Sequence, residues 1–210
     1  MDKAVVDAKC RMCRRAGEKL FLKGERCFGP KCAIVRRNYP PGVHGPQGSK
    51  KMTPYGLQLR EKQKAKEAFG IRERQMKNYY AKAKQVKGDT AHILLAMLES
   101  RLDNIVFRLG LAKSRSQARQ LVGHRHILVN GKILNIPSAQ IKSGATISLK
   151  PATAALPAFQ TLKESLERYT SPNWIKLNAN DLSGQVVASP TLEDLKQNFS
   201  VKTIIEFYSR

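Results

Sequence analysis

The four cysteines of this chain lie close together near its N-terminus, and their spacing is typical of a metal site. Cys10 and Cys13 form one pair, and Cys27 and Cys32 form a second pair after an interval of 13 residues. Two close pairs separated by a loop can supply four thiolates in the tetrahedral arrangement that zinc favours in structural sites. We therefore expect one structural zinc ion bound by all four cysteines, with disulfides or an iron–sulfur cluster as the alternatives.

Catalytic patterns are missing from the rest of the sequence. It has no Ser/His/Asp order, no Gly-rich phosphate loop and no H-E-x-x-H helix. Arg101-Leu102-Asp103 is similar to the catalytic triplet of pseudouridine synthases, which resembles G-R-L-D-x-x-T-x-G. Here Ser100 replaces the first Gly and the apolar run 105–107 follows. We interpret Asp103 as an exposed or ion-paired helix residue and predict that the chain is not an enzyme.

Positive charge dominates the first two thirds of the chain and predicts a polyanionic partner. The 210 residues carry 38 Lys and Arg against 16 Asp and Glu, a net charge of +22. Residues 1–90 hold 23 basic and 8 acidic residues (+15), residues 91–150 hold 9 and 2 (+7), and residues 151–210 hold 6 of each. Because like charges repel one another in a folded chain, a nucleic acid that neutralises them is the expected partner. The neutral, aromatic last third is expected to serve packing or protein contacts.

A membrane surface is the weaker alternative as a partner. No basic helix has a long apolar face, and no run of about 18 apolar residues occurs, so we expect no membrane association. The first residues, MDKAVVDAKC, lack the apolar core of a signal peptide, so we expect an intracellular protein.

Residues 100–131 predict a compact unit of two helices and a β-hairpin that carries several cations. Gly110 is expected to end the first helix, and Ser114 with Gln117 forms a capping box that starts the second. Asn130-Gly131 is a strong hairpin-turn signal. Apolar residues recur at helical spacing along the first helix, at Leu98, Leu102, Ile105, Val106 and Leu109.

The remaining pattern predicts an α+β protein with further helices and short strands. Residues 38–50 contain three prolines and three glycines, which predict an extended loop without a helix. A last helix follows Ser200, and we expect Ile205 to be buried where it docks. Thr53 followed by Pro54 is expected to start a helix over 53–69 that Gly70 ends. Other helices are expected over 71–86, 92–100 and 156–169, and strands over 146–149, 174–177 and 185–188, the last two joined through turn signals at 180–181 and 183–184.

The side chains that we expect to contact RNA are basic and lie within the first 132 residues. They are Arg14, Arg15, Arg36, Arg37, His44, Lys50, Lys51, Lys62, Arg72, Arg74, Lys113, Arg115, Arg119, Arg125 and Lys132. The alternative interpretation is that these charged side chains only form a solvent-exposed surface. It requires acidic partners, and in residues 1–90 cations outnumber acids nearly three to one.

Several long segments resemble the bacterial or organellar form of the ribosomal protein S4 family, in order and over the full length. They are CRMCRRAGEKLFLKGERCFGPKCA, YPPGVHG, YGLQLREKQKAK, ERQMKNYY, SRLDNIVFRLGLAKSRSQARQLV and IIEFYSR. The four cysteines follow the zinc-bearing branch of that family. The chain is therefore identified as a member of it.

The resemblance implies an α+β fold in which a helical domain carries an inserted RNA-binding module and a zinc-bound N-terminal extension. It places the extension and Pro/Gly loop at 1–45, the helical domain at 46–92 completed by 193–210, and the module with its small sheet at 93–192. It also implies a structural constituent of the small ribosomal subunit that binds the 5′ domain of the ribosomal RNA at a multi-helix junction and nucleates assembly.

Further implications concern the neighbourhood of such a protein. It would lie in the ribosome of the cytoplasm or an organelle, near the messenger RNA entry channel and ribosomal proteins S3 and S5. It would affect translational accuracy and would not form a homo-oligomer. Some members of the family repress their own messenger.

Two features depart from the family pattern and two other classes of protein compete with it. Val43 stands where the family often has Gln, and after His44 only Lys50 and Lys51 occur where relatives are often richer in Arg. A modifying enzyme or heat-shock protein that borrows the module would need its own catalytic domain. A DNA-binding zinc protein would need a helix that reaches base edges, and competition between RNA and DNA would distinguish it.

Overall fold

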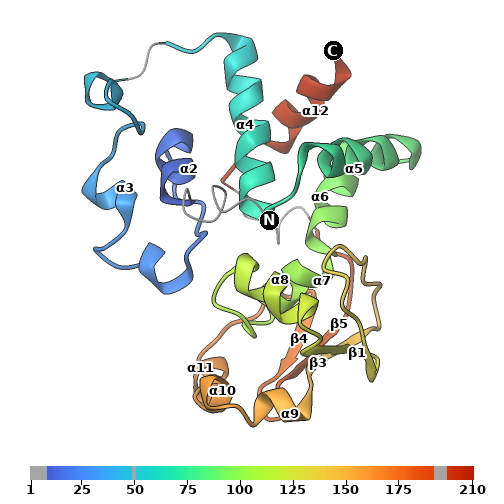
Figure 1. The fold of residues 1–210 in the computed structure, drawn as a ribbon. Helices are drawn as coiled ribbons and strands as arrows, with labels where there is room; N and C mark the ends of the chain where they lie inside the picture. Colours follow the sequence, from blue (N-terminus) through green and yellow to red (C-terminus); the bar gives the residue numbers. More distant parts are fainter. Residues whose placement is uncertain (1–8, 49–50, 192–197) are drawn as a thin grey trace. The chain divides into compact units, whose positions relative to one another are not determined.

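The computed structural model describes residues 9–48, 51–191 and 198–210, and the chain divides into two compact units. Unit 1 combines Met1–Ala91 with Gln197–Arg210, and unit 2 is His92–Lys196. Unit 1 is therefore built from the two ends of the chain, with unit 2 inserted between them (Figure 1). This division combines a mainly helical unit with a unit that contains an antiparallel sheet, so the α+β prediction is confirmed.

The N-terminal part of unit 1 consists of short elements joined by turns. They are α2 (Lys9–Ala16), the 3-10 helix η1 (Gly24–Cys27), α3 (Ala33–Arg36) and the 3-10 helix η2 (Gly45–Gln47). The last of these lies in the Pro/Gly loop that we predicted to be free of helix, so that prediction is wrong for three residues. A Cβ at Gly45 would lie 1.9 Å from the carbonyl oxygen of Pro40, which shows how closely this loop folds on itself.

The rest of unit 1 is built on α4 (Pro54–Phe69) and α5 (Glu73–Gln85). Thr53 caps α4 by accepting a hydrogen bond from the Gly56 N–H at 3.1 Å, and Gly70 ends it with a φ of 62°, as predicted. The terminal helix α12 (Val201–Ser209) lies beside α4 and α5 (Figure 1). Its buried residue is Ile204, whereas Ile205 is only half-buried, so the predicted burial of Ile205 is wrong by one position.

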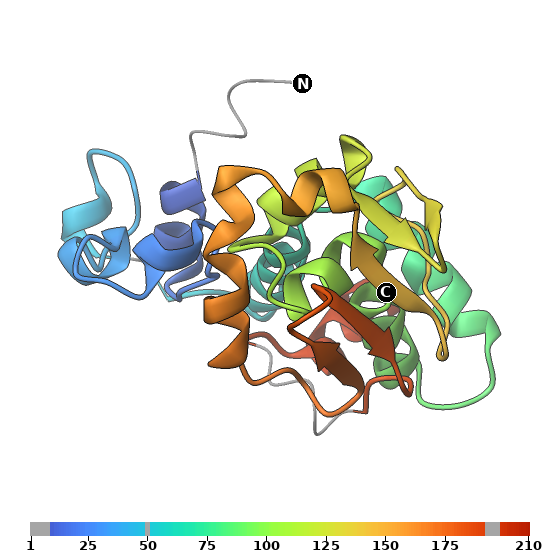
Figure 2. The ribbon, with the colours of Figure 1, turned by 90° about the horizontal axis from the view of Figure 1, so that it is seen from below.

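Unit 2 places helices against a five-stranded antiparallel sheet. The sheet order is β2-β1-β3-β5-β4, and Figure 2 shows the strands from below. The strands are β1 (Ile127–Val129), β2 (Lys132–Ile133), β3 (Thr146–Leu149), β4 (Ile175–Asn178) and β5 (Ser183–Val186). The helices are α6 (Thr90–Glu99), which starts in unit 1, α7 (Leu102–Arg108), α8 (Arg115–Gly123), α9 (Pro151–Ala154), α10 (Pro157–Gln160) and α11 (Leu162–Glu167).

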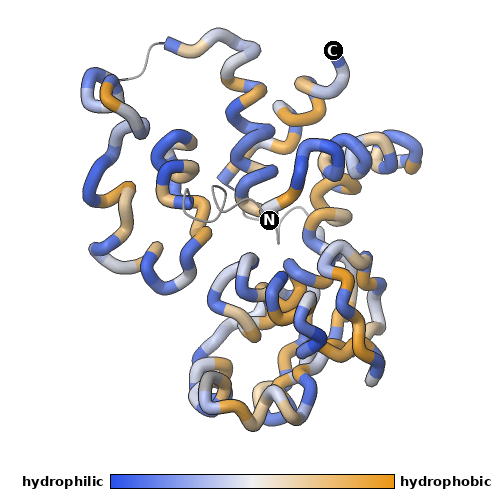
Figure 3. The backbone as a smooth tube through the Cα atoms, viewed as in Figure 1, coloured by the Kyte–Doolittle hydropathy of each residue, from blue (hydrophilic) through white to orange (hydrophobic). Residues whose placement is uncertain are grey.

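One apolar core joins the helices of unit 2 to its sheet. Ile105, Leu109, Val122, Ile127 and Ile147 are all fully buried in it. Figure 3 shows hydrophobic stretches of unit 2 in orange. The predicted hairpin is confirmed, because the turn between β1 and β2 has positive φ angles of 49° at Asn130 and 77° at Gly131.

The structure corrects the predicted first helix of the module. The stripe from Leu98 to Leu109 does not lie on one helix, because α6 ends at Glu99 and α7 begins at Leu102. Arg101 between them is extended, with φ −68° and ψ 139°, and it forms a β-bridge with Gln140. Tertiary pairing with a distant segment therefore interrupts a helical apolar pattern that continues through the break.

Two further predicted elements of unit 2 differ. The helix over 156–169 is two short helices, because Pro157 forces the preceding Leu156 into an extended conformation and Thr161 separates α10 from α11. The last strand is Ser183–Val186, so the predicted turn at 183–184 lies within a strand. Gly184 is needed there, since a Cβ at that position would lie 2.1 Å from the Leu109 side chain.

Candidate nucleic-acid interface

The break between α6 and α7 brings two buried carboxylates together with four arginines. Glu99 ends α6, Asp103 lies in the first turn of α7, and both are almost fully buried in unit 2. An isolated buried carboxylate would be strongly disfavoured, so each requires a cationic partner. We call this set the arginine network; it comprises Glu99, Arg101, Asp103, Asn104, Arg108, Arg115 and Arg119.

Asp103 is held by two of these arginines. Arg101, which is 1% exposed, donates from Nε and Nη2 to the two carboxylate oxygens at 3.0 and 2.8 Å. Arg119 on α8 donates from Nη2 and Nε to Oδ2 at 2.6 and 3.1 Å. Asp103 is thus ion-paired, as predicted, but it is buried and not exposed. It ties the start of α7 to α8.

Glu99 is held by the other two arginines and by an amide. Arg108 donates to its two oxygens at 3.0 and 2.7 Å, and Arg115 Nη2 lies 3.9 Å from Oε1. Burial opposes ionisation of Glu99, but the hydrogen bond and charge of Arg108, with Arg115 and Asn104, hold its pKa below the ordinary value. Burial lowers the pKa of Arg115 to about 10 against the attraction of Glu99, so this guanidinium stays charged at neutral pH.

The network changes how two of the predicted RNA contacts are interpreted. Arg115 also donates to Asn104 Oδ1 at 2.7 Å and lies 4.8 Å from the centre of the Phe107 ring, so much of its surface is used inside the fold. Arg119 pairs with Asp103 while its side chain remains 38% exposed. The four guanidiniums carry more positive charge than the two carboxylates neutralise. Arg119 has the most exposed side chain of the four arginines.

The other predicted contacts of unit 2 are exposed. Lys113 precedes the Ser114 cap of α8, Arg125 lies in the turn before β1 with a φ of 64°, and Lys132 begins β2. Their ammonium and guanidinium groups are accessible to phosphates.

Two of the predicted contacts in unit 1 are occupied by intramolecular interactions. The side chain of Lys62 is only 7% exposed; its Nζ lies 2.9 Å from Glu73 Oε1 and 4.4 Å from the centre of the Phe207 ring. Arg14 donates to the carbonyl oxygens of Tyr39 and Pro40 at 2.9 and 3.1 Å and covers the Tyr39 ring at 4.7 Å. Lys62 therefore anchors α12, and Arg14 anchors the Pro/Gly loop.

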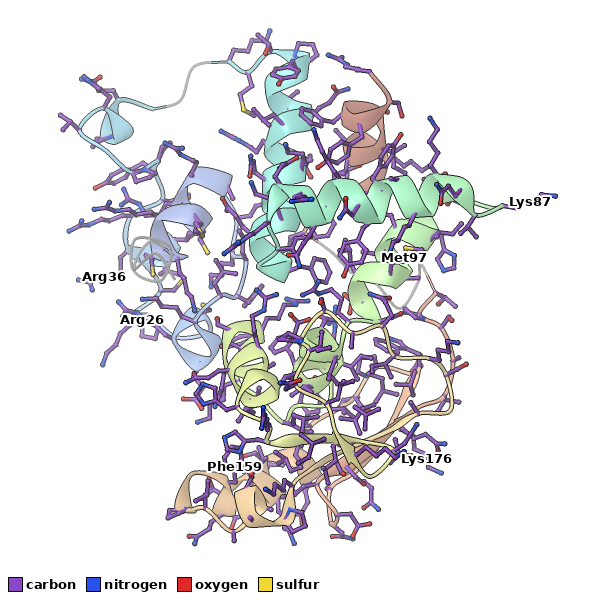
Figure 4. The ribbon with its side chains drawn as sticks, turned by 45° about the vertical axis from the view of Figure 1, so that its right-hand side comes forward. Arg26, Arg36, Lys87, Met97, Phe159 and Lys176 are labelled. Carbon is purple, nitrogen blue, oxygen red and sulfur yellow. The ribbon has the colours of Figure 1, made fainter. Side chains whose placement is uncertain are left out.

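The remaining unit 1 contacts lie on the surface. Arg26 and Arg36, labelled in Figure 4, both belong to the exposed residues of the N-terminal segment. Arg26 was not among our predicted contacts, and its position after Glu25 carries no signal that distinguishes it. Lys50 lies outside the described residues. The predicted contacts that are exposed in unit 1 are Arg15, Arg36, Arg37, His44, Lys51, Arg72 and Arg74.

The four cysteines lie around one small cavity. Cys10, Cys13, Cys27 and Cys32 all line a cavity of about 20 Å³ and all are free thiols. The Lys23 N–H donates to Cys27 Sγ at 3.3 Å. Burial raises the pKa of Cys13, and the neighbouring cysteines add to this, while the Leu20 backbone N–H lowers it.

The four thiols line the same cavity, but their positions do not form a metal-binding geometry. In the ranges that the structure describes, no three Cys, His, Asp or Glu side chains are arranged as a metal site. The donor set, four sulfurs around one cavity with backbone N–H groups directed at two of them, nevertheless has the chemistry that a structural zinc ion needs. None of the described helices has the length and apolar character required to cross a bilayer.

Comparison with known proteins assigns both parts of the chain. Residues 5–99 match the model of the ribosomal protein S4/S9 N-terminal domain, and residues 100–147 match that of the S4 domain. The chain is 52% identical over 201 residues to the small ribosomal subunit protein uS4 of Heliobacterium modesticaldum, covering 96% of each chain. It is 51% identical to the proteins of the same name from Halothermothrix orenii, with 96% of each chain covered, and Acetivibrio thermocellus, with 97% covered. These similarities over almost the whole chain show that it belongs to the uS4 family of small ribosomal subunit proteins, which are structural and not enzymatic.

Proposed function

We propose that this protein is a structural constituent of the small ribosomal subunit and binds its ribosomal RNA. The observation that carries the proposal is similarity to uS4 proteins over almost the whole chain at about half identity. The net charge of +22 supports it, because a protein with so large a surplus is suited to neutralising phosphates.

The finer part of the proposal concerns which RNA is bound and where. The resemblance favours a multi-helix junction in the 5′ domain, bound early so that it nucleates assembly. It also favours a position near the messenger RNA entry channel and ribosomal proteins S3 and S5, from which the protein affects accuracy. Structured RNA offers mainly phosphates and 2′-hydroxyls, so recognition would depend on junction shape.

The exposed cations are the proposed contacts of this interface. We retain Arg15, Arg36, Arg37, His44, Lys51, Arg72, Arg74, Lys113, Arg119, Arg125 and Lys132, and assign Arg14, Lys62 and Arg115 to internal packing.

Titration of the full chain with separate transcripts tests the proposal. We expect the 5′-domain transcript to bind much more tightly than a 3′-domain transcript of equal length, with duplex DNA a poor competitor. The double variant Arg36→Ala, Arg37→Ala should bind about tenfold or more weakly, since each lost charge-assisted contact is worth about 1–2 kcal/mol. Lys176→Ala, an exposed cation of the neutral last third, is the matched control. Equal affinity for both transcripts would contradict junction recognition.

We also propose that the four cysteines hold one structural zinc ion. Metal analysis of protein purified under reducing conditions should find about one zinc per chain. Cys27→Ser should loosen residues 9–37 while unit 2 stays folded, because the binding free energy of such a site stabilises the structure around it. The fluorescence of Trp174, which is buried in unit 2, shows whether unit 2 stays folded. Disulfides in freshly lysed cells, or iron with inorganic sulfide, would overturn the zinc assignment.

A further inference from the structure

Two phenylalanines of the N-terminal segment form an aromatic pair that is open to solvent. The ring centres of Phe21 and Phe28 lie 5.1 Å apart and their planes are inclined by 31°. Phe28 is 75% exposed, against 51% for Tyr55 and 39% for Tyr169, the other exposed tyrosines and phenylalanines of the described residues. We call Phe21 and Phe28 the aromatic platform. Phe21, which is half-buried, lies against Phe28 and leaves most of the Phe28 side chain exposed.

The backbone holds Phe21 in place at a conformational disadvantage. Its φ is 52°, in the left-handed region that bulky side chains rarely adopt. The turn that contains it is tied to two sulfurs, because the Leu20 N–H bonds to Cys13 and the Lys23 N–H donates to Cys27 Sγ at 3.3 Å. A strained residue whose surroundings fix it in this way, with its ring against an exposed partner, suggests a binding role.

The platform lies in a strongly basic segment, residues 9–37. Residues 9–37 contain ten Lys and Arg and two Glu, a net charge of +8. Lys23, Arg26 and Lys31 flank Phe28 in the sequence and are all exposed. Arg26 Nε donates to the Lys31 carbonyl oxygen at 3.4 Å, so this hydrogen bond spans the residues on either side of Phe28.

We propose that Phe28, backed by Phe21, is the stacking site for one unpaired RNA base, with Lys23, Arg26 and Lys31 contacting the adjoining phosphates. This inference rests on the proposed RNA-binding function and adds a base contact to it. Exposed aromatic rings between cations hold unstacked bases in many RNA-binding proteins, because every base has a face that can stack and a phosphate beside it. A protein partner fits less well, since charged residues are depleted at the centre of protein interfaces.

Three variants of the full chain separate ring stacking from apolar area. Phe28→Leu removes the aromatic face, Phe28→Tyr keeps it, and Val35→Ala removes another exposed apolar side chain, 58% exposed, from the same segment. The probe is the transcript of the 5′ domain of small-subunit ribosomal RNA. We expect Phe28→Leu to bind about 5- to 150-fold more weakly, the range typical for loss of one stacked base. Phe28→Tyr and Val35→Ala should bind within about twofold of the unmodified chain.

The salt dependence of binding distinguishes the ring from the cations around it. Phe28→Leu should leave the slope of log affinity against log salt unchanged, because no phosphate contact is lost. Arg26→Gln should reduce the slope by about 1. Thermal melts should be unchanged for all of these variants, since each replaces an exposed side chain.

The other possible results distinguish failure of the proposed function from failure of the aromatic platform. If the unmodified chain fails to bind this transcript, the proposed function falls and the platform falls with it. If the unmodified chain binds and Phe28→Leu binds equally well, the platform alone is overturned. If Phe28→Leu binds the transcript normally but enters small subunits poorly, the site serves a protein contact and base stacking is overturned. Equal weakening by Phe28→Leu and Phe28→Tyr would also overturn stacking.

Discussion

Burial differs sharply among the arginines of the arginine network, and it determines what each residue does. Arg101 is 1% exposed and Arg119 is 38% exposed, although both pair with Asp103. A guanidinium enclosed by protein must keep a carboxylate partner, whereas a partly solvated one can exchange it for water or phosphate. Asp103 thus stabilises the fold of unit 2, and Arg119 is the arginine of the pair whose guanidinium is partly exposed to solvent.

Substitution of these two residues should separate the roles. Asp103→Asn should lower the free energy of unfolding by about 3–5 kcal/mol, because it removes the charge that compensates the buried Arg101. Arg119→Ala should cost about 1 kcal/mol or less, since Asp103 keeps Arg101, while weakening RNA binding. Urea unfolding alongside RNA titration measures both effects. The exposed Asp181→Asn is the control, and a larger loss of stability for Arg119→Ala than for Asp103→Asn would contradict this division.

The buried Glu99 makes the module sensitive to acid. Its pKa is lower in the folded state than in the unfolded state, so its contribution to stability is present above the unfolded pKa of about 4.3 and is lost as the pH falls through the folded value. We expect the urea midpoint of unit 2, followed by Trp174 fluorescence, to fall steeply below about pH 4. Glu99→Gln should be less stable at pH 7 and lose less stability on acidification. Parallel pH profiles for the two proteins would show that Glu99 is not responsible.

At the scale of elements, several polar and aromatic contacts fasten α12 to α4 and α5. Tyr208 donates to Glu73 Oε1 at 2.8 Å, the carboxylate that also pairs with Lys62 at 2.9 Å. Tyr80 stacks on Tyr208 with ring centres 5.1 Å apart. Burial and the bonded Glu73 carboxylate raise the pKa of Tyr208, so its hydroxyl remains a donor throughout the neutral range. The last helix therefore completes unit 1.

Adjacent isoleucines of α12 provide the test of this docking. Ile204 is 1% exposed, and Ile204→Ala should lower the free energy of unfolding by about 2–4 kcal/mol through lost burial and a cavity. Ile205→Ala, at a half-buried position of the same helix, should cost about half as much or less. Tyrosine fluorescence and circular dichroism during thermal unfolding compare the two. A larger effect at Ile205 would mean that the helix docks through its other face.

Over the whole molecule, charge and packing are divided along the chain. The first 150 residues carry the entire net charge, while the neutral last third supplies buried aromatic residues to both units. Phe159 and Trp174 belong to the core of unit 2, and Phe199 packs edge-on against Phe69 in unit 1 with ring centres 6.3 Å apart. These contacts account for three of the aromatic residues of the last third through packing.

Binding of RNA should weaken steeply as salt rises. If about eight phosphates are neutralised, log affinity should fall against log salt with a slope of about −6, using the coefficient for single strands. The slope is obtained from titrations of the 5′-domain transcript between low and physiological salt. Replacing Lys176 in the neutral third should leave the slope unchanged, whereas replacing Arg36 should reduce it. A slope near zero for the unmodified chain would contradict backbone-dominated binding.

Local sequence signals by themselves determine several elements of this protein. The Thr53 cap and Gly70 end of α4, the Ser114 cap of α8 and the Asn130-Gly131 turn all depend on residues within a few positions of one another, and all are confirmed. The surplus of positive charge and the family membership are likewise properties of the sequence itself. Local hydrogen bonds and conformational preferences are sufficient to specify such features.

Only the tertiary structure decided which cations are exposed and where the apolar stripe breaks. Periodicity continues through Arg101, yet pairing with Gln140, 39 positions away, extends the backbone there and brings Glu99 and Asp103 into one buried site. Nothing in the sequence around Lys62 distinguishes it from a surface lysine. It is buried because α12, from the far end of the chain, packs against it. Burial depends on segments that are distant in sequence. The sequence around a charged side chain is the same whether that side chain contacts water, a carboxylate or a phosphate.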